Sequence, residues 1–148
     1  MTAAPPAELA DVIDRYDHVS MAVEDFESVD ALVALLGAQR FDGGYAASAD
    51  FHWVQYELPG TGRLEMIRTD STDPDHFINR FLATHGEGLH HLTFKVNDLE
   101  AAAAAATEKG FTLVGYDESD PGWKEVFIHP RSANGVLIQL AEFSAEEP

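Results

Sequence analysis

Two stretches of the chain share one pattern of apolar and polar positions. One reads HVSMAVEDFE from His18 and the other reads HLTFKVNDLE from His91. Each starts as an alternating strand and reaches an aspartate, Asp25 or Asp98, of the kind that N-caps a helix. A glycine suited to ending that helix follows 19 residues past each histidine. The chain therefore carries an internal repeat.

Three strand-like segments follow each predicted helix, and the sequence PGTG marks a turn between two of them. The six segments are expected at residues 38–45, 51–58, 63–69, 111–116, 123–129 and 135–143. A further helix is expected at residues 74–84, between the two halves. This order predicts an α+β protein with two tandem βαβββ modules, which form paired curved sheets around a central cleft.

The expected organisation follows from these elements and from the character of the two ends. The N-terminal stretch lacks the basic start and apolar centre of a signal peptide, so we expect a flexible leader, and the C-terminal end is expected to fray. The predicted parts are a leader at 1–14, a first module at 15–69, a connecting helix and loop at 70–87, a second module at 88–143 and a tail at 144–148.

The composition argues against several kinds of site and partner. The absence of cysteine excludes disulfides and thiolate metal sites, and favours a cytoplasmic protein. A net charge of −17, from 26 acidic and 9 basic residues, opposes non-specific nucleic-acid binding. No apolar run approaches the roughly 20 residues that a membrane-spanning helix needs. The negative charge leaves open a cationic ligand, and it makes any phosphate-bearing small-molecule substrate depend on a local basic cluster.

The repeat distinguishes His91 from its neighbour His90. Adjacent residues on a strand point to opposite faces, and His91 is the one that matches His18. On the last strand of each half, Glu65 lies 47 positions past His18 and Gln139 lies 48 past His91. His18, Glu65, His91 and Gln139 are therefore the candidate site, while His90 is expected to pack or to form hydrogen bonds.

The candidate set suits a divalent metal ion with open coordination positions. Imidazole is a ligand of zinc, cobalt, nickel and iron, and carboxylate and amide oxygens also suit magnesium and manganese. Polar side chains within apolar strands need partners once they are buried. Glu65 stands between Leu64 and Met66, and Gln139 stands between Ile138 and Leu140. The sequence thus predicts a metal site but leaves the metal open.

The same residues carry a resemblance to a known family. The sequence resembles the vicinal oxygen chelate superfamily of glyoxalases, extradiol dioxygenases and bleomycin-resistance proteins, and within it the methylmalonyl-CoA epimerases. The matching segments are DHVSMAV, RLEMI, FLATHGEGLHHLTFKVNDLEA and FIHPRSANGVLIQL. The resemblance implies paired βαβββ modules around a divalent metal, cobalt included, with His18, Glu65 and His91 as ligands. Gln139 stands where the epimerases carry a glutamate that is both ligand and proposed base.

The resemblance implies an epimerase or isomerase that stabilises an enolate beside a thioester or related carbonyl. Such chemistry uses the metal as a Lewis acid and two acid–base groups at the reacting carbon. An amide cannot accept and return a proton, so Glu65 remains as the base among the ligands. His52 is the candidate for the second group, and Glu57 is a weaker one. Candidates for binding an acyl-CoA are Lys124, His129 and Arg131, although HPRS is equally suited to a hairpin-closing turn.

Two other functions are compatible with the sequence. Two histidines and one carboxylate are the ligands of non-haem iron enzymes, so a dioxygenase or a glyoxalase-type lyase is one alternative. The superfamily's dioxygenases take the carboxylate from the last strand, where this chain has Gln139. A non-catalytic resistance protein that binds a cationic drug is the other, given the negative charge and Trp53 and Trp123. A homodimer is the expected assembly in each case.

Overall fold

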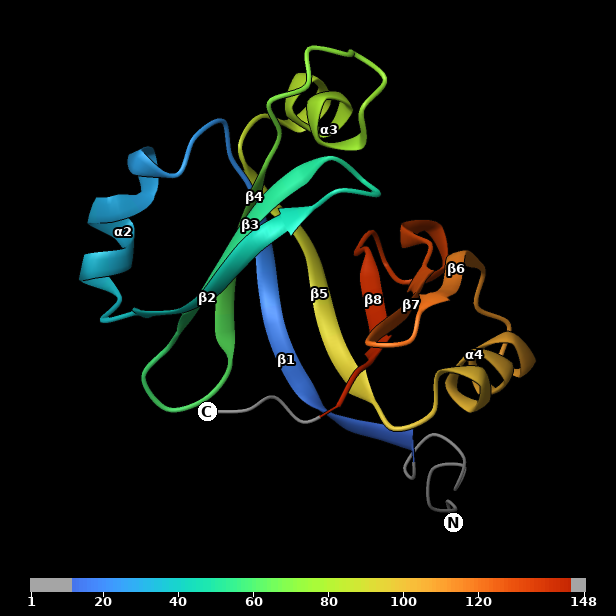
Figure 1. The fold of residues 1–148 in the computed structure, drawn as a ribbon. Helices are drawn as coiled ribbons and strands as arrows, with labels where there is room; N and C mark the ends of the chain where they lie inside the picture. The colour runs from blue at the N-terminus through green and yellow to red at the C-terminus, as the bar shows by residue number, and fades with distance from the viewer. Residues whose placement is uncertain (1–11, 145–148) are drawn as a thin grey trace. The chain divides into compact units, whose positions relative to one another are not determined.

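A computed structural model describes residues 12–144 of the 148-residue chain (Figure 1). Most of the expected leader, residues 1–11, and most of the expected tail, residues 145–148, lie outside the described residues. The elements are β1 (Ile13–Ala22), η1 (Glu27–Val29), α2 (Asp30–Leu35), β2 (Gln39–Ala46), β3 (Phe51–Glu57), β4 (Arg63–Arg68), α3 (Phe77–His85), β5 (Gly88–Val96), α4 (Leu99–Glu108), β6 (Leu113–Asp120), β7 (Trp123–Ile128), η2 (Pro130–Ser132) and β8 (Ile138–Glu142).

The described chain divides into two compact units. The first unit comprises residues 18–90, and the second unit joins residues 12–17 to residues 91–144. Strand β1 starts two residues before the expected first module, and its first half belongs to the second unit. The reason is local pairing, because the backbone N–H of Asn97 donates to the carbonyl of Val12 at 2.7 Å.

In the first unit the strand order is β2-β3-β4-β1. Strand β3 pairs antiparallel with both β2 and β4, whereas β1 pairs parallel with β4. Apolar side chains lie on both faces, because helix α2 covers a cluster that includes Val54 and Met66, and helix α3 covers Ile67.

In the second unit the first half of β1 is followed by the order β5-β8-β7-β6. Strands β5 and β8 are parallel, and the pairs β7–β8 and β6–β7 are antiparallel. Helix α4 packs its Leu99 and Ala102 against Val126 and Leu140 of the strands. Figure 1 shows α4 beside β6, β7 and β8. The α+β class and the βαβββ content of both halves are therefore confirmed.

The two repeated helices differ more than the repeat predicts. Asp98 caps α4 as expected, since its carboxylate accepts a hydrogen bond from the Ala101 backbone N–H at 3.0 Å. Asp25 accepts the equivalent bond from Ser28 at 2.8 Å, but the three-residue 3-10 turn η1 separates it from the six-residue α2. The alanine run of α4 favours a helix intrinsically, whereas the first half has no such run.

The connecting helix starts later in the chain than the expected range of residues 74–84. Helix α3 begins at Phe77, because the side-chain Nδ1 of His76 accepts a hydrogen bond from the Ile78 N–H at 3.1 Å and serves as the N-cap.

Across residues 12–144, no helix combines the length and the apolar character that crossing a membrane requires.

Candidate functional site

The first unit buries a histidine against a carboxylate. His18 on β1 is 1% exposed, and its Nε2 lies 3.5 Å from Oε1 of Glu65 on β4, which is also buried. The parallel register places Ser20 opposite Glu65, and alternation places His18 on the same side of the strand as Ser20. Two residues 47 positions apart in sequence are thus neighbours because β1 and β4 pair directly.

The second carboxylate oxygen of Glu65 is held by an amide. Gln55 on β3 lies opposite Glu65 in the antiparallel register, and its Nε2 donates to Oε2 of Glu65 at 2.9 Å. Burial of an ionised carboxylate is costly unless hydrogen bonds or opposite charges compensate it. Gln55 therefore orients Glu65 so that its Oε1 faces His18. We call the side of the sheet that carries Ser20, Gln55 and Glu65 the Glu65 face.

Ser20 adds an unused polar group to the Glu65 face. The side chain is fully buried, and its Oγ has no hydrogen-bond partner among residues 12–144. Buried hydroxyl groups in proteins are nearly always satisfied by protein or water. An unsatisfied hydroxyl directly opposite Glu65 is consistent with a bound species completing this site.

The second unit holds a polar network around Gln139. The hydroxyl of Thr93 on β5 donates to Oε1 of Gln139 on β8 at 2.6 Å, and Nε2 of Gln139 donates to Oε1 of Glu125 on β7 at 2.7 Å. The register pairs Thr93 with Gln139 and Gln139 with Phe127. We call the side that carries Thr93, Glu125 and Gln139 the Gln139 face. His91 shares it, with its ring centroid 6.2 Å from that of Phe127.

Glu125 is a member of this polar network that sequence reasoning missed. Its Oε1 also accepts a hydrogen bond from the indole Nε1 of Trp123 at 2.8 Å. The available signal was the alternation in WKEVFI, which places Trp123, Glu125 and Phe127 on one side of β7. That alternation alone does not identify the facing residue on β8, because the register between the strands decides it.

The chain matches the sequence profile of a known protein superfamily. A profile of the Glyoxalase/Bleomycin resistance protein/Dioxygenase superfamily matches residues 17–127, which is most of the chain. The chain belongs to this superfamily. The resemblance inferred from the sequence motifs is confirmed, and the two βαβββ units described above are its superfamily fold.

Within the superfamily, the chain is similar to proteins named as epimerases. The ethylmalonyl-CoA/methylmalonyl-CoA epimerase of Cereibacter sphaeroides is 28% identical over 141 residues, covering 88% of this chain and 99% of that protein. A Streptomyces coelicolor methylmalonyl-CoA epimerase variant, solved with 2-nitronate-propionyl-CoA, has a TM-score of 0.77 at 26% identity, with coverage of 92% and 99%. The Mycobacterium tuberculosis methylmalonyl-CoA epimerase has a TM-score of 0.78 at 25% identity, with coverage of 98% and 94%.

His90 has the packing role that the alternation of side chains along the strand predicted. Its ring meets those of Phe77 and Phe81 on α3 edge to face, at centroid distances of 5.8 and 4.9 Å. Burial lowers the pKa of His90, and the negative charge of Glu65 offsets part of that effect. His90 and His91 therefore have different environments, because His90 packs with the aromatic rings of α3 and His91 lies on the Gln139 face.

The structure does not bring His52 to Glu65. Nε2 of His52 lies 3.0 Å from the carboxylate of Asp70, and its ring lies 4.8 Å from that of Tyr45. Strand alternation points the side chains of His52 and Gln55 to opposite sides of the sheet, so His52 is not on the Glu65 face. The expected acid–base role of His52 thus has no support from its position. Glu57 is an exposed residue whose carboxylate lies 3.9 Å from Arg63.

The three basic candidates do not form one cluster. Lys124 points away from the Gln139 face, with its Nζ 3.9 Å from Glu142. The Nδ1 of His129 accepts a hydrogen bond from the Arg131 N–H at 2.9 Å, so HPRS forms the turn η2. Arg131 is exposed just after β7, whereas Lys124 is near the start of that strand, and the length of β7 separates them. The turn interpretation of HPRS is confirmed.

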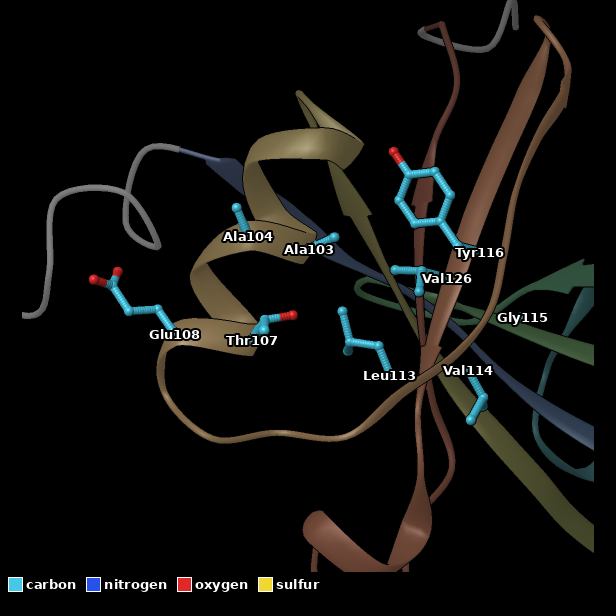
Figure 2. Close-up of a pocket in the computed structure, with 9 residues that line it drawn as sticks. All are labelled: Ala103, Ala104, Thr107, Glu108, Leu113, Val114, Gly115, Tyr116 and Val126. Atoms are coloured by element: carbon cyan, nitrogen blue, oxygen red, sulfur yellow. The ribbon is translucent and has the colours of Figure 1, made fainter.

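A groove of about 840 Å³ lies in the second unit, on the side of the strands that faces away from the Gln139 face (Figure 2). Ala103 and Thr107 of α4 line one wall, and Leu113 and Tyr116 of β6 line the other. Val126 forms part of the lining, and it alternates with Glu125 along β7. This mostly apolar groove therefore lies behind the Gln139 face.

Proposed function

We propose that this superfamily member is a metal-dependent epimerase or isomerase that stabilises an enolate beside a thioester or related carbonyl. The observation that carries the proposal is the buried pair of His18 and Glu65, with Nε2 and Oε1 3.5 Å apart. Similarity to proteins named methylmalonyl-CoA epimerase supports the reaction type and an acyl-CoA as the substrate.

We propose His18, Glu65, His91 and Gln139 as the ligands of a divalent metal ion, with cobalt, nickel, zinc, manganese, magnesium and iron as candidates. The donor chemistry fits, because two imidazoles, one carboxylate and one amide oxygen suit these ions. The ligand atoms of His18 and Glu65 lie within 4.8 Å of each other. The Oε1 of Gln139 accepts one hydrogen bond from Thr93 and has a second lone pair for a ligand bond. When bound, the metal would act as a Lewis acid toward the substrate carbonyl.

Glu65 is the proposed base among these residues. Its Oε2 is held by Gln55, which fixes the plane of the carboxylate and leaves Oε1 on the side of His18. Removal of the α-proton breaks the C–H bond, transfers the proton to the carboxylate and moves the electron pair into the carbonyl group. A positioned carboxylate contributes about 10² to 10⁴ in rate to such a step.

The remaining parts of the proposal concern recognition and assembly. Arg131 is the exposed cation best suited to a CoA phosphate, because His129 caps the turn η2 and Lys124 pairs with Glu142. We further propose a homodimer, an assembly that occurs in the superfamily. A cytoplasmic location is proposed from the absence of cysteine.

The test is metal-dependent exchange of the substrate α-proton. Purified protein is stripped with a chelator, reloaded with one metal at a time, and incubated with methylmalonyl-CoA in D₂O. We expect deuterium at the α-carbon with at least one metal, and loss of this exchange after chelation. Absence of exchange with all six candidate metals would contradict the proposal.

An oxygenase or a glyoxalase-type lyase is the second candidate, and the combination of two histidines with the carboxylate of Glu65 is the observation that favours it. The amide has replaced the glutamate implied by the epimerase resemblance, while two histidines and Glu65 remain as a donor set for Fe(II). Oxygen uptake with Fe(II) and a catechol or a 2-oxo acid, without α-proton exchange, would favour this candidate.

A further inference from the structure

We propose that Ser20 is a positioning residue for Glu65, and that its hydroxyl donates a hydrogen bond to the Glu65 carboxylate when the metal ion is bound. This inference rests on the part of the proposed function that makes His18 and Glu65 metal ligands. Ser20 is itself neither a ligand nor a base in that proposal. All the residues involved belong to the first unit.

The hydroxyl of Ser20 is an unsatisfied group in a place where such groups are costly. The residue is 0% exposed, and its Oγ has no hydrogen-bond partner within residues 12–144. A buried hydroxyl without a partner destabilises a protein, because folding removes it from water without replacing its hydrogen bonds. Complete burial also keeps bulk solvent from Oγ. A protein group that comes within reach in another state of the site is therefore the expected partner.

Glu65 is the acceptor that strand pairing places next to Ser20. The two residues are register partners on β1 and β4, so their side chains leave the same side of the sheet from strands about 4.8 Å apart. A carboxylate accepts hydrogen bonds at both oxygens, about four in all. Gln55 donates one of them to Oε2. The group therefore has the capacity to bind an ion through Oε1 and to accept the Ser20 hydroxyl as well.

A bound ion would move the carboxylate in the direction of Ser20. The Nε2 of His18 and the Oε1 of Glu65 lie 3.5 Å apart, which is longer than a hydrogen bond. Two such ligand atoms that bind one ion at right angles lie about 3 Å apart. The ion therefore draws Glu65 toward β1, and this strand carries both His18 and Ser20. The shift brings the carboxylate closer to the Ser20 hydroxyl.

The hydrogen bond from Ser20 would make the buried hydroxyl part of the metal site. Carboxylates that bind metal ions are themselves held by hydrogen bonds, and losing such a partner typically costs 10- to 100-fold in metal affinity. Gln55 provides this support from β3, and Ser20 provides it from β1. The Ser20 hydroxyl therefore stabilises the loaded protein and destabilises the stripped one, which distinguishes its role from that of an ordinary buried serine.

The experiment compares the metal affinity and the thermal stability of Ser20→Ala with those of the wild type. Isothermal titration of the stripped full-length proteins with each of the six candidate metal ions gives the affinity, and circular dichroism gives the melting temperature. We expect Ser20→Ala to bind the preferred metal about 10- to 100-fold more weakly. Its stripped form should melt at the temperature of the wild type or above it, because the substitution removes a buried unsatisfied hydroxyl.

Thr69→Val is the matched control, because it removes a hydroxyl that has its hydrogen bonds. The Oγ1 of Thr69 donates to the carbonyl of Asp50 at 2.7 Å and accepts from the Ser71 N–H at 3.0 Å. This variant should leave the metal affinity unchanged and should lower the melting temperature of the stripped protein. The two variants are thus expected to give opposite patterns.

Two results would overturn the role of Ser20 alone. One is equal metal affinity in Ser20→Ala and the wild type. The other is a lower melting temperature of stripped Ser20→Ala, since a buried water or a protein group would then satisfy the hydroxyl without the metal. A wild type that binds none of the six metals would overturn the proposed ligand set, and this role with it. None of these measurements depends on turnover, so their result is separate from that of the α-proton exchange assay.

Discussion

The imidazole of His18 and the carboxylate of Glu65 are buried together, with Nε2 and Oε1 3.5 Å apart. The contact joins the parallel strands β1 and β4, and Gln55 holds the far oxygen of the carboxylate from β3. Three strands of the first unit thus place one imidazole and one carboxylate before any ion is bound. Such preorganisation lowers the cost of binding a metal, because the ligand side chains are already ordered.

Metal binding should depend on this pair. We expect His18→Ala to lower the affinity for the preferred divalent metal by at least about tenfold, since even residues behind metal ligands typically contribute that much. His52→Ala is the matched control, because His52 contacts Asp70 outside the Glu65 face and its loss should leave affinity unchanged. Isothermal titration with the stripped proteins measures both. Equal affinities for wild type and His18→Ala would remove His18 from the ligand set.

Gln139→Glu should change the pH dependence of the reaction. The new carboxylate would lie beside that of Glu125, in place of an amide nitrogen 2.7 Å away. Two carboxylates in contact cannot both ionise easily, so the apparent pKa of the pair's second ionisation rises. We expect the acidic limb of the interconversion rate to move to higher pH, as measured by pH–rate profiles of the metal-loaded proteins. An unmoved limb would show that residues 125 and 139 do not titrate together.

The core of the second unit should be sensitive to truncation at Leu99. This residue is fully buried and packs with Val126 and Leu140. We expect Leu99→Ala to lower the free energy of unfolding by about 2 to 5 kcal/mol. Leu35→Ala is the control, because Leu35 is 81% exposed at the end of α2 and should change stability by less than about 0.5 kcal/mol. Urea denaturation followed by circular dichroism compares the two, and equal losses would contradict the assigned burial.

Tyr116 should titrate at unusually high pH. A hydrogen bond from its hydroxyl to Glu118, at 2.6 Å, raises the pKa of Tyr116 to about 12. The folded state therefore holds this proton more tightly than the unfolded chain, so its contribution to stability is complete below about pH 10 and is lost as the pH rises through about 12. The phenolate absorbance of wild type minus that of Tyr116→Phe isolates the residue. Glu118→Gln should move the midpoint down toward 10, and a midpoint near 10 in the wild type would refute the hydrogen bond.

The repeat in the sequence was enough to pair the four residues of the proposed metal site. His18 matches His91, and Glu65 matches Gln139, because duplicated strands keep the same alternation and nearly the same spacing. The helix-capping role of Asp98 and the packing role of His90 also followed from local patterns, and both are confirmed. Periodicity and capping are properties of neighbouring residues, so they can be read without knowing the fold.

Cross-strand relationships could not be predicted in the same way. His52 lies on a strand next to that of Glu65, yet it points to the other side, and Glu125 meets Gln139 although they are 14 positions apart. The pairing of β1 with β4 determines that Ser20 lies opposite Glu65. The sequence by itself determined the duplicated βαβββ units and the types of residue available for chemistry. Only the tertiary structure decided which carboxylate meets which amide, because strand register is set by packing and hydrogen bonding between segments distant in the chain.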